Sequence, residues 1–243
     1  MTTPTQSNPQ ARRRVVYVCI TIATLSLVPH LARSFDVTDG LRVGASASTN
    51  EASSTAIMLG YYNTNPSPAA AAIGWYNSLG GPNYGYGSLA VGCYNTLSGY
   101  TAFAFGHSNI VYAMDSMGLG SYNTVAGASS LAFGEGCMTA SSGRQSLAGG
   151  HYNYAVGDSS AALGYYTSAY SHASLVIGRY NQPVGDESTN SAAATSWRNQ
   201  DSLFVIGNGT SNSSRNNVFQ VSKDGTIKMQ RQGDILMGEF TAP

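Results

Sequence analysis

Glycine returns at nearly fixed intervals through the middle of this 243-residue chain. From Gly60 to Gly178 the successive spacings are 14, 18, 14, 14, 14, 16, 14 and 14 residues, so most intervals are identical and two are longer. A fixed repeat of this length indicates a stacked architecture, in which each repeat forms one coil against the next. The candidate turn glycines are Gly60, Gly74, Gly92, Gly106, Gly120, Gly134, Gly150, Gly164, Gly178 and, after a longer interval, Gly207.

The residues before each glycine alternate between small and large side chains. The pattern is Ser, large apolar, Ala, large apolar, Gly, as in SLAVG (88–92) and SLAFG (130–134). A period of two predicts a strand, with Leu131 and Phe133 on one side and Ser130 and Ala132 on the other. Neither side is charged, which is typical of parallel strands that are covered on both faces.

The residues after each glycine form a second part of the repeat: one variable residue, then Tyr and Asn in most repeats. Because Gly and Asn adopt positive φ readily, we expect a corner here. Fourteen residues then hold two strands of about four or five residues and two tight turns, which predicts an all-β fold, a parallel β-roll that grows by ~4.8 Å per coil.

The repeated tyrosines have two interpretations, both open: a packing ladder between coils, or an aromatic surface that binds a ligand. They are Tyr62, Tyr76, Tyr94, Tyr122, Tyr152, Tyr166 and Tyr180.

The N-terminus has the features of an export signal. Three arginines (12–14) precede fourteen apolar residues (15–28), and Ala32 and Ser34 suit a cleavage site before Phe35. A membrane span needs about 20 apolar residues, so a cleaved signal peptide over 1–34 is expected, with a retained N-terminal anchor as the alternative. A lead-in over 35–50 would follow, and the protein would be secreted or on the cell surface.

The C-terminal part departs from the repeat. Head repeats over 51–178 are followed by an insertion loop over 179–202 and then by LFVIGNGT (203–210), which reuses the ending of the repeat. Asp224-Gly225 lies between two alternating apolar runs, a strong hairpin signal. Residues 203–243 are therefore predicted to hold the last coil and a C-terminal β-hairpin that caps its open end.

Composition and motifs argue against several classes of function. Loss of residues 1–34 would leave eight basic against 12 acidic residues, without the basic cluster that nucleic acid requires. Cys93 and Cys137 are too few for a disulfide scaffold and are expected to be small apolar residues. Zinc-protease, serine-hydrolase and calcium-repeat motifs do not occur. We expect no enzyme activity, no cofactor and no metal site.

Nine repeats of the type SLAFG followed by x-Tyr-Asn resemble the head repeats of trimeric autotransporter adhesins, the YadA-type left-handed parallel β-roll. The resemblance covers residues 51–178 and implies the left hand and a homotrimer, in which three rolls pack side by side. The segment from Leu203 to Met229 resembles those that close such heads in bacterial surface proteins and phage tail fibres. Neither a heptad stalk nor a set of membrane strands is present in the sequence. Membrane anchoring would need another component or a retained N-terminal segment.

The expected function is therefore that of a bacterial adhesin-like head, secreted or on the cell surface, that binds host, matrix or glycan surfaces. Candidate determinants are the repeated tyrosines and two coil insertions, 79–87 and 137–144. The alternative is a purely structural rod or fibre subunit with no ligand. An ice-binding solenoid would need rows of Thr-x-Thr, which the chain lacks.

Overall fold

The computed structural model describes residues 41–43, 56–67, 69–80 and 86–229. These residues form a parallel β-solenoid that ends in antiparallel strands, which confirms the predicted all-β class and C-terminal hairpin. A single helix, α1 (Ser191–Thr195), occurs in the described part of the chain. The predicted signal peptide and most of the lead-in lie outside the described residues, apart from β1 (Leu41–Val43), which pairs with the first strand of the roll.

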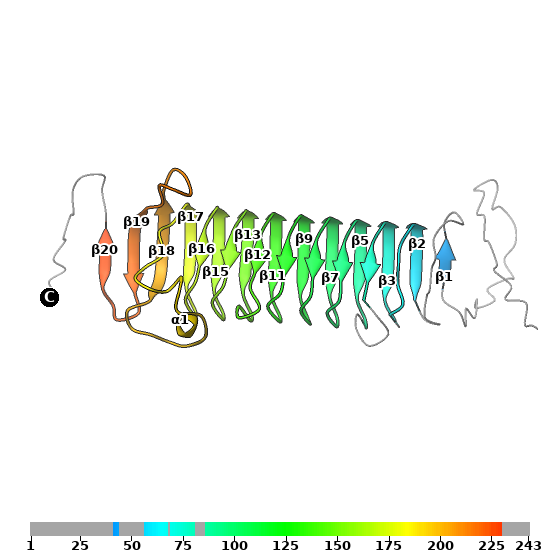
Figure 1. Cartoon of the computed structure of the whole chain (residues 1–243), viewed down its shortest axis with the longest axis horizontal. Coiled ribbons are helices and arrows are strands. Elements are labelled where there is room, and N and C mark those ends of the chain that lie inside the picture. The colour runs from blue at the N-terminus through cyan, green and yellow to red at the C-terminus, as the bar shows by residue number, and fades with distance from the viewer. Residues whose placement is uncertain (1–40, 44–55, 68, 81–85, 230–243) are drawn as a thin grey trace, which may run out of the picture. The chain divides into compact units, whose positions relative to one another are not determined.

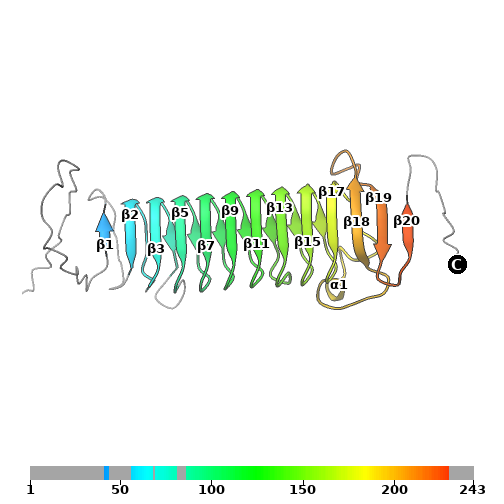
Figure 2. The ribbon, with the colours of Figure 1, turned by 180° about the vertical axis from the view of Figure 1, so that it is seen from behind.

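Each coil of the roll contributes one five-residue strand to a long parallel sheet. Adjacent long strands pair so that the repeated glycines lie opposite one another, for example Gly120 opposite Gly134. Figures 1 and 2 show these strands side by side along the axis of the roll. They are β2 (Ile57–Tyr61), β3 (Ala71–Trp75), β5 (Leu89–Cys93), β7 (Phe103–His107), β9 (Met117–Ser121), β11 (Leu131–Glu135), β13 (Leu147–His151), β15 (Ala161–Tyr165) and β17 (Leu175–Arg179).

The second strand of each coil has only two residues, instead of the four or five expected. A buried residue, in most coils an asparagine, precedes it and a turn follows, so two residues remain for backbone pairing. The seven short strands form the second sheet of the roll. They are β4 (Ser78–Leu79), β6 (Thr96–Leu97), β8 (Ile110–Val111), β10 (Thr124–Val125), β12 (Met138–Thr139), β14 (Tyr154–Ala155) and β16 (Ser168–Ala169).

The core of the roll is one side chain deep. The second residue of each long strand is buried, as at Ala104 and Ala132, and faces one apolar residue of the short sheet, such as Val111 or Val125. Such a coil encloses little apolar volume. The larger side chains of the long strands, as the alternation predicts, point outward and stay partly exposed.

The repeated glycines are required by a close approach between coils. Gly120 has a φ of +106°, and a Cβ built there would lie well inside 3.0 Å of the carbonyl oxygen of Gly134. The same approach links the glycines along the roll from Gly60 to Gly178. All the predicted turn glycines lie inside strands, from Gly60 to Gly178 as the fourth residue of the long strand with a positive φ. Gly207, inside β18 (Ser202–Asn208), has no positive φ, and a Cβ there would meet the backbone of Arg179 and Asn181.

A ladder of buried asparagines runs beside the glycines. Nδ2 of Asn109 lies 2.9 Å from the carbonyl oxygen of Gly120 in the next coil and 3.0 Å from Oδ1 of Asn95 in the previous coil. Its own Oδ1 accepts hydrogen bonds from the backbone and the side chain of Asn123. The ladder therefore satisfies buried backbone carbonyls that would otherwise destabilise the fold.

Two residues replace asparagine in this ladder. Thr167 donates its hydroxyl to Oδ1 of Asn153 at 2.6 Å. Cys137 offers only its backbone N–H to Asn123, at 2.9 Å, and burial raises the pKa of its thiol, so the buried side chain stays neutral. Neither described cysteine forms a disulfide.

The C-terminal end of the roll is closed by the insertion and by a reversal of strand direction. The long strand β18 adds to β17 in parallel, and β19 (Asn217–Ser222) and β20 (Ile227–Met229) then run antiparallel. Helix α1 lies against the last turns, because the carbonyls of Ala193 and Ala194 accept hydrogen bonds from the backbone of His172 and Asp158.

Charged groups tie the insertion together. Nη2 of Arg198 lies 2.6 Å from Oδ1 of Asp186, and hydrogen bonds from Asn190 and Arg198 lower the pKa of that carboxyl. Burial raises the pKa of Asp201 and lowers that of Lys223. The backbone of Lys223 donates to the carbonyl of Asp201 at 2.9 Å, which joins the insertion to the hairpin.

The glycine contact predicts a large difference between two substitutions at positive φ. Gly120→Ala should destabilise the protein by more than about 4 kcal/mol, because its Cβ would force adjacent coils apart. Gly185→Ala should cost only about 1–2 kcal/mol, the usual penalty of a left-handed residue, because no atom lies within 4 Å. Chemical denaturation of both variants measures the difference, and equal losses would contradict the steric argument.

Candidate functional site

The predicted tyrosines form one column along the edge where the long strands end. We call Tyr62, Tyr76, Tyr94, Tyr122, Tyr152, Tyr166 and Tyr180 the tyrosine column. The rings of Tyr76 and Tyr94 have centroids 5.0 Å apart and are inclined by 2°, and Tyr62 stacks on Tyr76 at 4.7 Å. Tyr152, Tyr166 and Tyr180 stack in the same way near the other end. The first four members are each about half exposed as whole residues.

The corner is made by the tyrosines and not by the asparagines, contrary to the expectation from the sequence. The tyrosines have φ values between 42° and 58°, and the asparagines that follow them are not in this region. The asparagine side chains point inward to the ladder, so the preceding residue takes the left-handed conformation. Tyrosine is strained there relative to glycine, and ring stacking offsets this strain.

The tyrosine column has two gaps. Ser108 replaces tyrosine between Tyr94 and Tyr122, where the ring of His107 lies edge-on to both, at 5.7 and 5.2 Å. The ring of Tyr152 lies over Gly136, where a Cβ would meet it at 2.7 Å. Ring faces are therefore covered where tyrosines stack on one another or lie over Gly136, whereas Tyr122 has only the edge-on contact with His107 and is 58% exposed.

A second column lies directly beside the first and was not singled out from the sequence. It consists of the residue after each repeated glycine, and we call it the variable column. Because it ends each long strand, its members are neighbours in register, as Glu135, His151 and Tyr165 are. The members are Tyr61, Trp75, Cys93, His107, Ser121, Glu135, His151, Tyr165 and Arg179. The two columns together form an aromatic edge.

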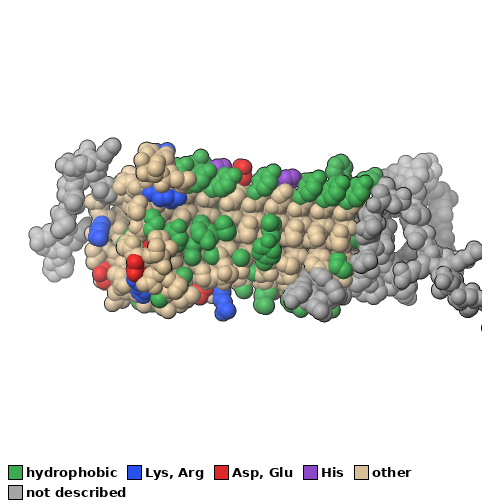
Figure 3. All heavy atoms as spheres, in the orientation of Figure 1, with side chains coloured by type: hydrophobic (Ala, Val, Ile, Leu, Met, Phe, Trp, Pro, Cys, Tyr) green, Lys and Arg blue, Asp and Glu red, His purple; other side chains and the backbone are tan. Residues whose placement is uncertain are grey.

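The two ends of the aromatic edge differ in charge. Near β2 and β3 it is uncharged, with Trp75 58% exposed and edge-on to Tyr61 at 6.1 Å. Near β11 to β17 it carries Glu135, 3.7 Å from His151, and then Arg179. Figure 3 shows hydrophobic side chains in a row along the upper edge, with histidines and an acidic side chain among them.

Two phenol groups near the C-terminal end of the aromatic edge are held in the neutral form. Partial burial, together with the neighbouring Tyr165, raises the pKa of both Tyr166 and Tyr180. The charge on this edge at neutral pH therefore comes from the variable column and from Arg215, which lies over the ring of Tyr180 at 5.9 Å.

In both longer coils the predicted insertion begins too early, because its first residues belong to the regular short strand. In the predicted insertion 137–144, Met138 and Thr139 occupy their regular places in β12, so the extra residues fall in the turn after it. Ser142 and Arg144 in that turn bond the next coil, through the carbonyl of Val156 and the side chain of Asp158. In the predicted insertion 79–87, Leu79 is a buried core residue of β4, and residues 81–85 lie outside the described part.

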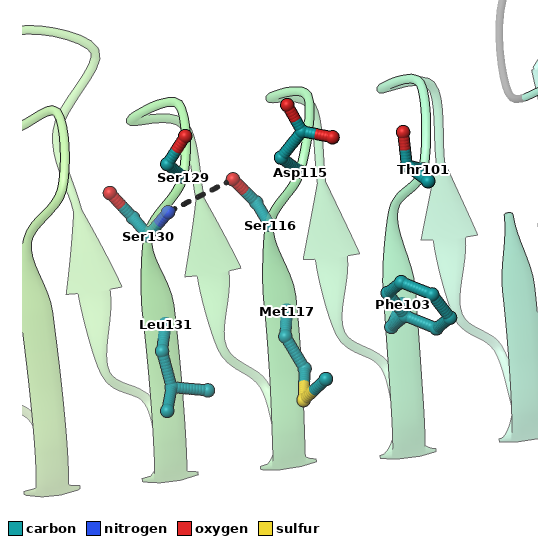
Figure 4. A pocket seen from close by; sticks show the side chains of 8 residues that line it. All are labelled: Thr101, Phe103, Asp115, Ser116, Met117, Ser129, Ser130 and Leu131. Carbon is teal, nitrogen blue, oxygen red and sulfur yellow. Dashed lines mark hydrogen bonds between the residues drawn. The ribbon is translucent and has the colours of Figure 1, made fainter.

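A shallow groove of about 380 Å³ lies where the long strands begin. Figure 4 shows Phe103, Met117 and Leu131 along neighbouring strands, below a polar row of Thr101, Asp115 and Ser129. The backbone N–H of the adjacent Ser130 donates to the hydroxyl of Ser116 at 3.2 Å, so these serines serve the fold. The groove has one carboxylate and no neighbouring base, an arrangement suited to contact rather than to acid–base chemistry.

Among the described residues, no group of three or more potential metal ligands occurs. The same part of the chain contains no helix with the length and apolar character of a membrane span. The expected absence of catalysis stays a prediction.

Searches of protein-family models, curated proteins and solved structures found no match to this chain.

The two interpretations of the tyrosine column can be separated by one pair of variants. Tyr76 and Tyr122 have similar φ values, 51° and 57°, but Tyr76 stacks on two tyrosines and Tyr122 contacts His107 alone among the described rings. Replacing either by Gly relieves the same backbone strain. Tyr76→Gly should therefore be less stable than Tyr122→Gly by about 1–2 kcal/mol in thermal or chemical unfolding. Equal stability would show that stacking contributes nothing.

Proposed function

We propose that this chain is an adhesin-like head, secreted or held on a bacterial cell surface, that works as a homotrimer of YadA-type rolls. The single observation that carries the proposal is an uncharged outer sheet face beside an exposed aromatic edge. The 14-residue parallel coil supports the resemblance in architecture. The predicted signal peptide supports the location.

The outer face of the long sheet is apolar and is not covered by other described parts of the chain. Its two columns, which we call the apolar face, contain only apolar residues and one glycine over twelve strands. They are Ile57, Ala71, Leu89, Phe103, Met117, Leu131, Leu147, Ala161, Leu175, Phe204, Val221 and Ile227, and Leu59, Ile73, Val91, Phe105, Leu119, Phe133, Gly149, Leu163, Ile177, Ile206, Phe219 and Met229. At ~4.8 Å per strand and ~12 Å of width, the face covers about 700 Å².

An uncharged face of this size exceeds the largest patch of most monomers, and it approaches the ~800 Å² that each partner buries in a standard interface. Closed symmetry is the usual solution for identical chains. A trimer about an axis parallel to the roll, as the resemblance implies, would cover the apolar face of each chain and leave all three aromatic edges accessible.

The aromatic edge is the surface that we assign to ligand binding. Trp75 and Tyr61 are exposed, keep their hydrogen-bonding groups and lose little entropy on binding, as is usual for recognition surfaces. Because the faces of the tyrosine column are used in stacking, we assign discrimination between ligands to the variable column. Glycan and matrix surfaces are the expected targets.

A structural rod without a ligand is the second candidate, and the stacking of the tyrosine column favours it. Rings that contact each other at 4.7–5.0 Å already have a role in holding successive coils together. In that case the aromatic edge would stabilise the rod and bind nothing.

The trimer is tested by mass in solution. Residues 35–243 should give three times the chain mass in light scattering at micromolar concentration. Leu175→Asp, on the apolar face and 39% exposed, should raise the dissociation concentration about tenfold or more, because the carboxylate would be buried unpaired in the trimer. The control is Tyr112→Asp, which should remain a trimer. Tyr112 is 55% exposed and lies in the turn after β8, at the edge of the roll opposite to the aromatic edge. A monodisperse monomer for the parent chain would contradict the trimer.

Attachment is tested on beads coated with the protein. The double variant Tyr61→Ser and Trp75→Ser should reduce attachment to glycan or matrix arrays several-fold, while its melting temperature stays near that of the parent chain. The control is Tyr112→Ser with Met114→Ser, two equally exposed residues at the opposite edge. Unchanged attachment by a folded variant that also lacks Tyr94, Tyr122 and Tyr152 would favour the structural rod.

A further inference from the structure

The antiparallel end of the chain keeps the outward pattern of the roll although the strand direction reverses. In β18, Phe204 and Ile206 lie beside Leu175 and Ile177 of β17. In the hairpin, Phe204 pairs with Val221 and Ile206 with Phe219, and these two pair in turn with Ile227 and Met229. The two columns of the apolar face therefore run without a break from the parallel coils into β20. Figure 2 shows β18, β19 and β20 in line with the long strands of the roll.

A local irregularity makes this continuity possible. Ser202 pairs with Ser222, and unbroken pairing would place Gln220 opposite Phe204. The register shifts between Ser202 and Phe204 by one residue, so Val221 takes that place. A shift of one residue moves every following side chain to the other face. The bulge thus puts Val221 and Phe219 on the outer face and leaves Gln220 buried on the inner one.

The outer face of this hairpin is left open within the described chain. Ile227 and Met229 are 53% and 52% exposed, whereas the inner face is covered at β19, where Gln220 and Ser222 are each less than 8% exposed. Two strands with exposed apolar residues at the end of a sheet are marginal alone and are normally paired or covered.

We infer that the cap hairpin, β19 and β20, is part of the contact between copies of this chain. This inference rests on the proposed trimer and extends it beyond the coils. A second copy is the fitting occupant, because it presents the same uncharged row with the same ~4.8 Å rung spacing at the same height. The hairpin also adds four of the residues that bring the face to about the area of a standard interface.

The inference is tested by two neighbouring residues of β20 in the full mature chain. Met229 belongs to the apolar face, whereas Lys228 points to the other side and is also exposed. Met229→Asp should raise the trimer dissociation concentration about tenfold or more, since the new carboxylate would be buried without a partner. Lys228→Asp should change it less than twofold. Because both side chains are exposed in the single chain, neither change should prevent folding.

A cross-linking experiment gives an independent readout. In a Cys93→Ser background, Met229→Cys should form disulfides between chains under mild oxidation, and Lys228→Cys should not. A stable trimer with no Met229→Cys cross-links and equal dissociation for the two Asp variants would overturn the inference and leave the trimer standing. A monomeric parent chain would overturn both, so the two failures are distinguishable.

Discussion

Six buried asparagines of the ladder donate a hydrogen bond to the glycine carbonyl of the following coil, and the rest of the structure depends on this contact. It requires the two backbones to approach more closely than a Cβ permits, which is why glycine is needed at that place. The asparagine side chain, in place of a backbone carbonyl, accepts the backbone N–H of the residue before the next short strand, which is why that strand has only two residues. The contact also places the residue before the asparagine in the left-handed region. The glycine period, the short sheet and the position of the tyrosines follow from one polar contact repeated along the axis.

The periodicity of the sequence was sufficient to predict the long strands, their parallel stacking, the hairpin at Asp224-Gly225 and the outward direction of residues such as Leu131 and Phe133. It was insufficient for the corner, because the preference of asparagine for positive φ is a local property. Burial of Asn109 between two coils is a tertiary effect that overrides it. The same limit applies to the insertion predicted over 137–144. The number of extra residues in this coil was right, but Met138 and Thr139 pair in register with β10 and β14, so the extra residues follow β12. The left hand of the coil stays a prediction.

The candidate site was predictable in part for a similar reason. Seven tyrosines at matched positions imply a column, and the structure contains it. The variable column was overlooked because its residues share no chemical type, and only the strand register reveals that Trp75, His107 and Glu135 form a line. Repetition in sequence thus points to residues that hold the coils together. Variation at a repeated position points to residues on which selectivity can depend.

The strict register of the long strands makes the height of the protein adjustable in fixed steps. Duplication of one 14-residue unit would add ~4.8 Å and would supply its own glycine, asparagine and outward pair, so both ends of the roll would keep their contacts. Extra residues are accommodated in the turn after the short strand, where they alter neither column. Lengthening or shortening of the gene by whole units would therefore change the length of the roll in steps of one coil, while the contacts that hold each coil to the next stay the same.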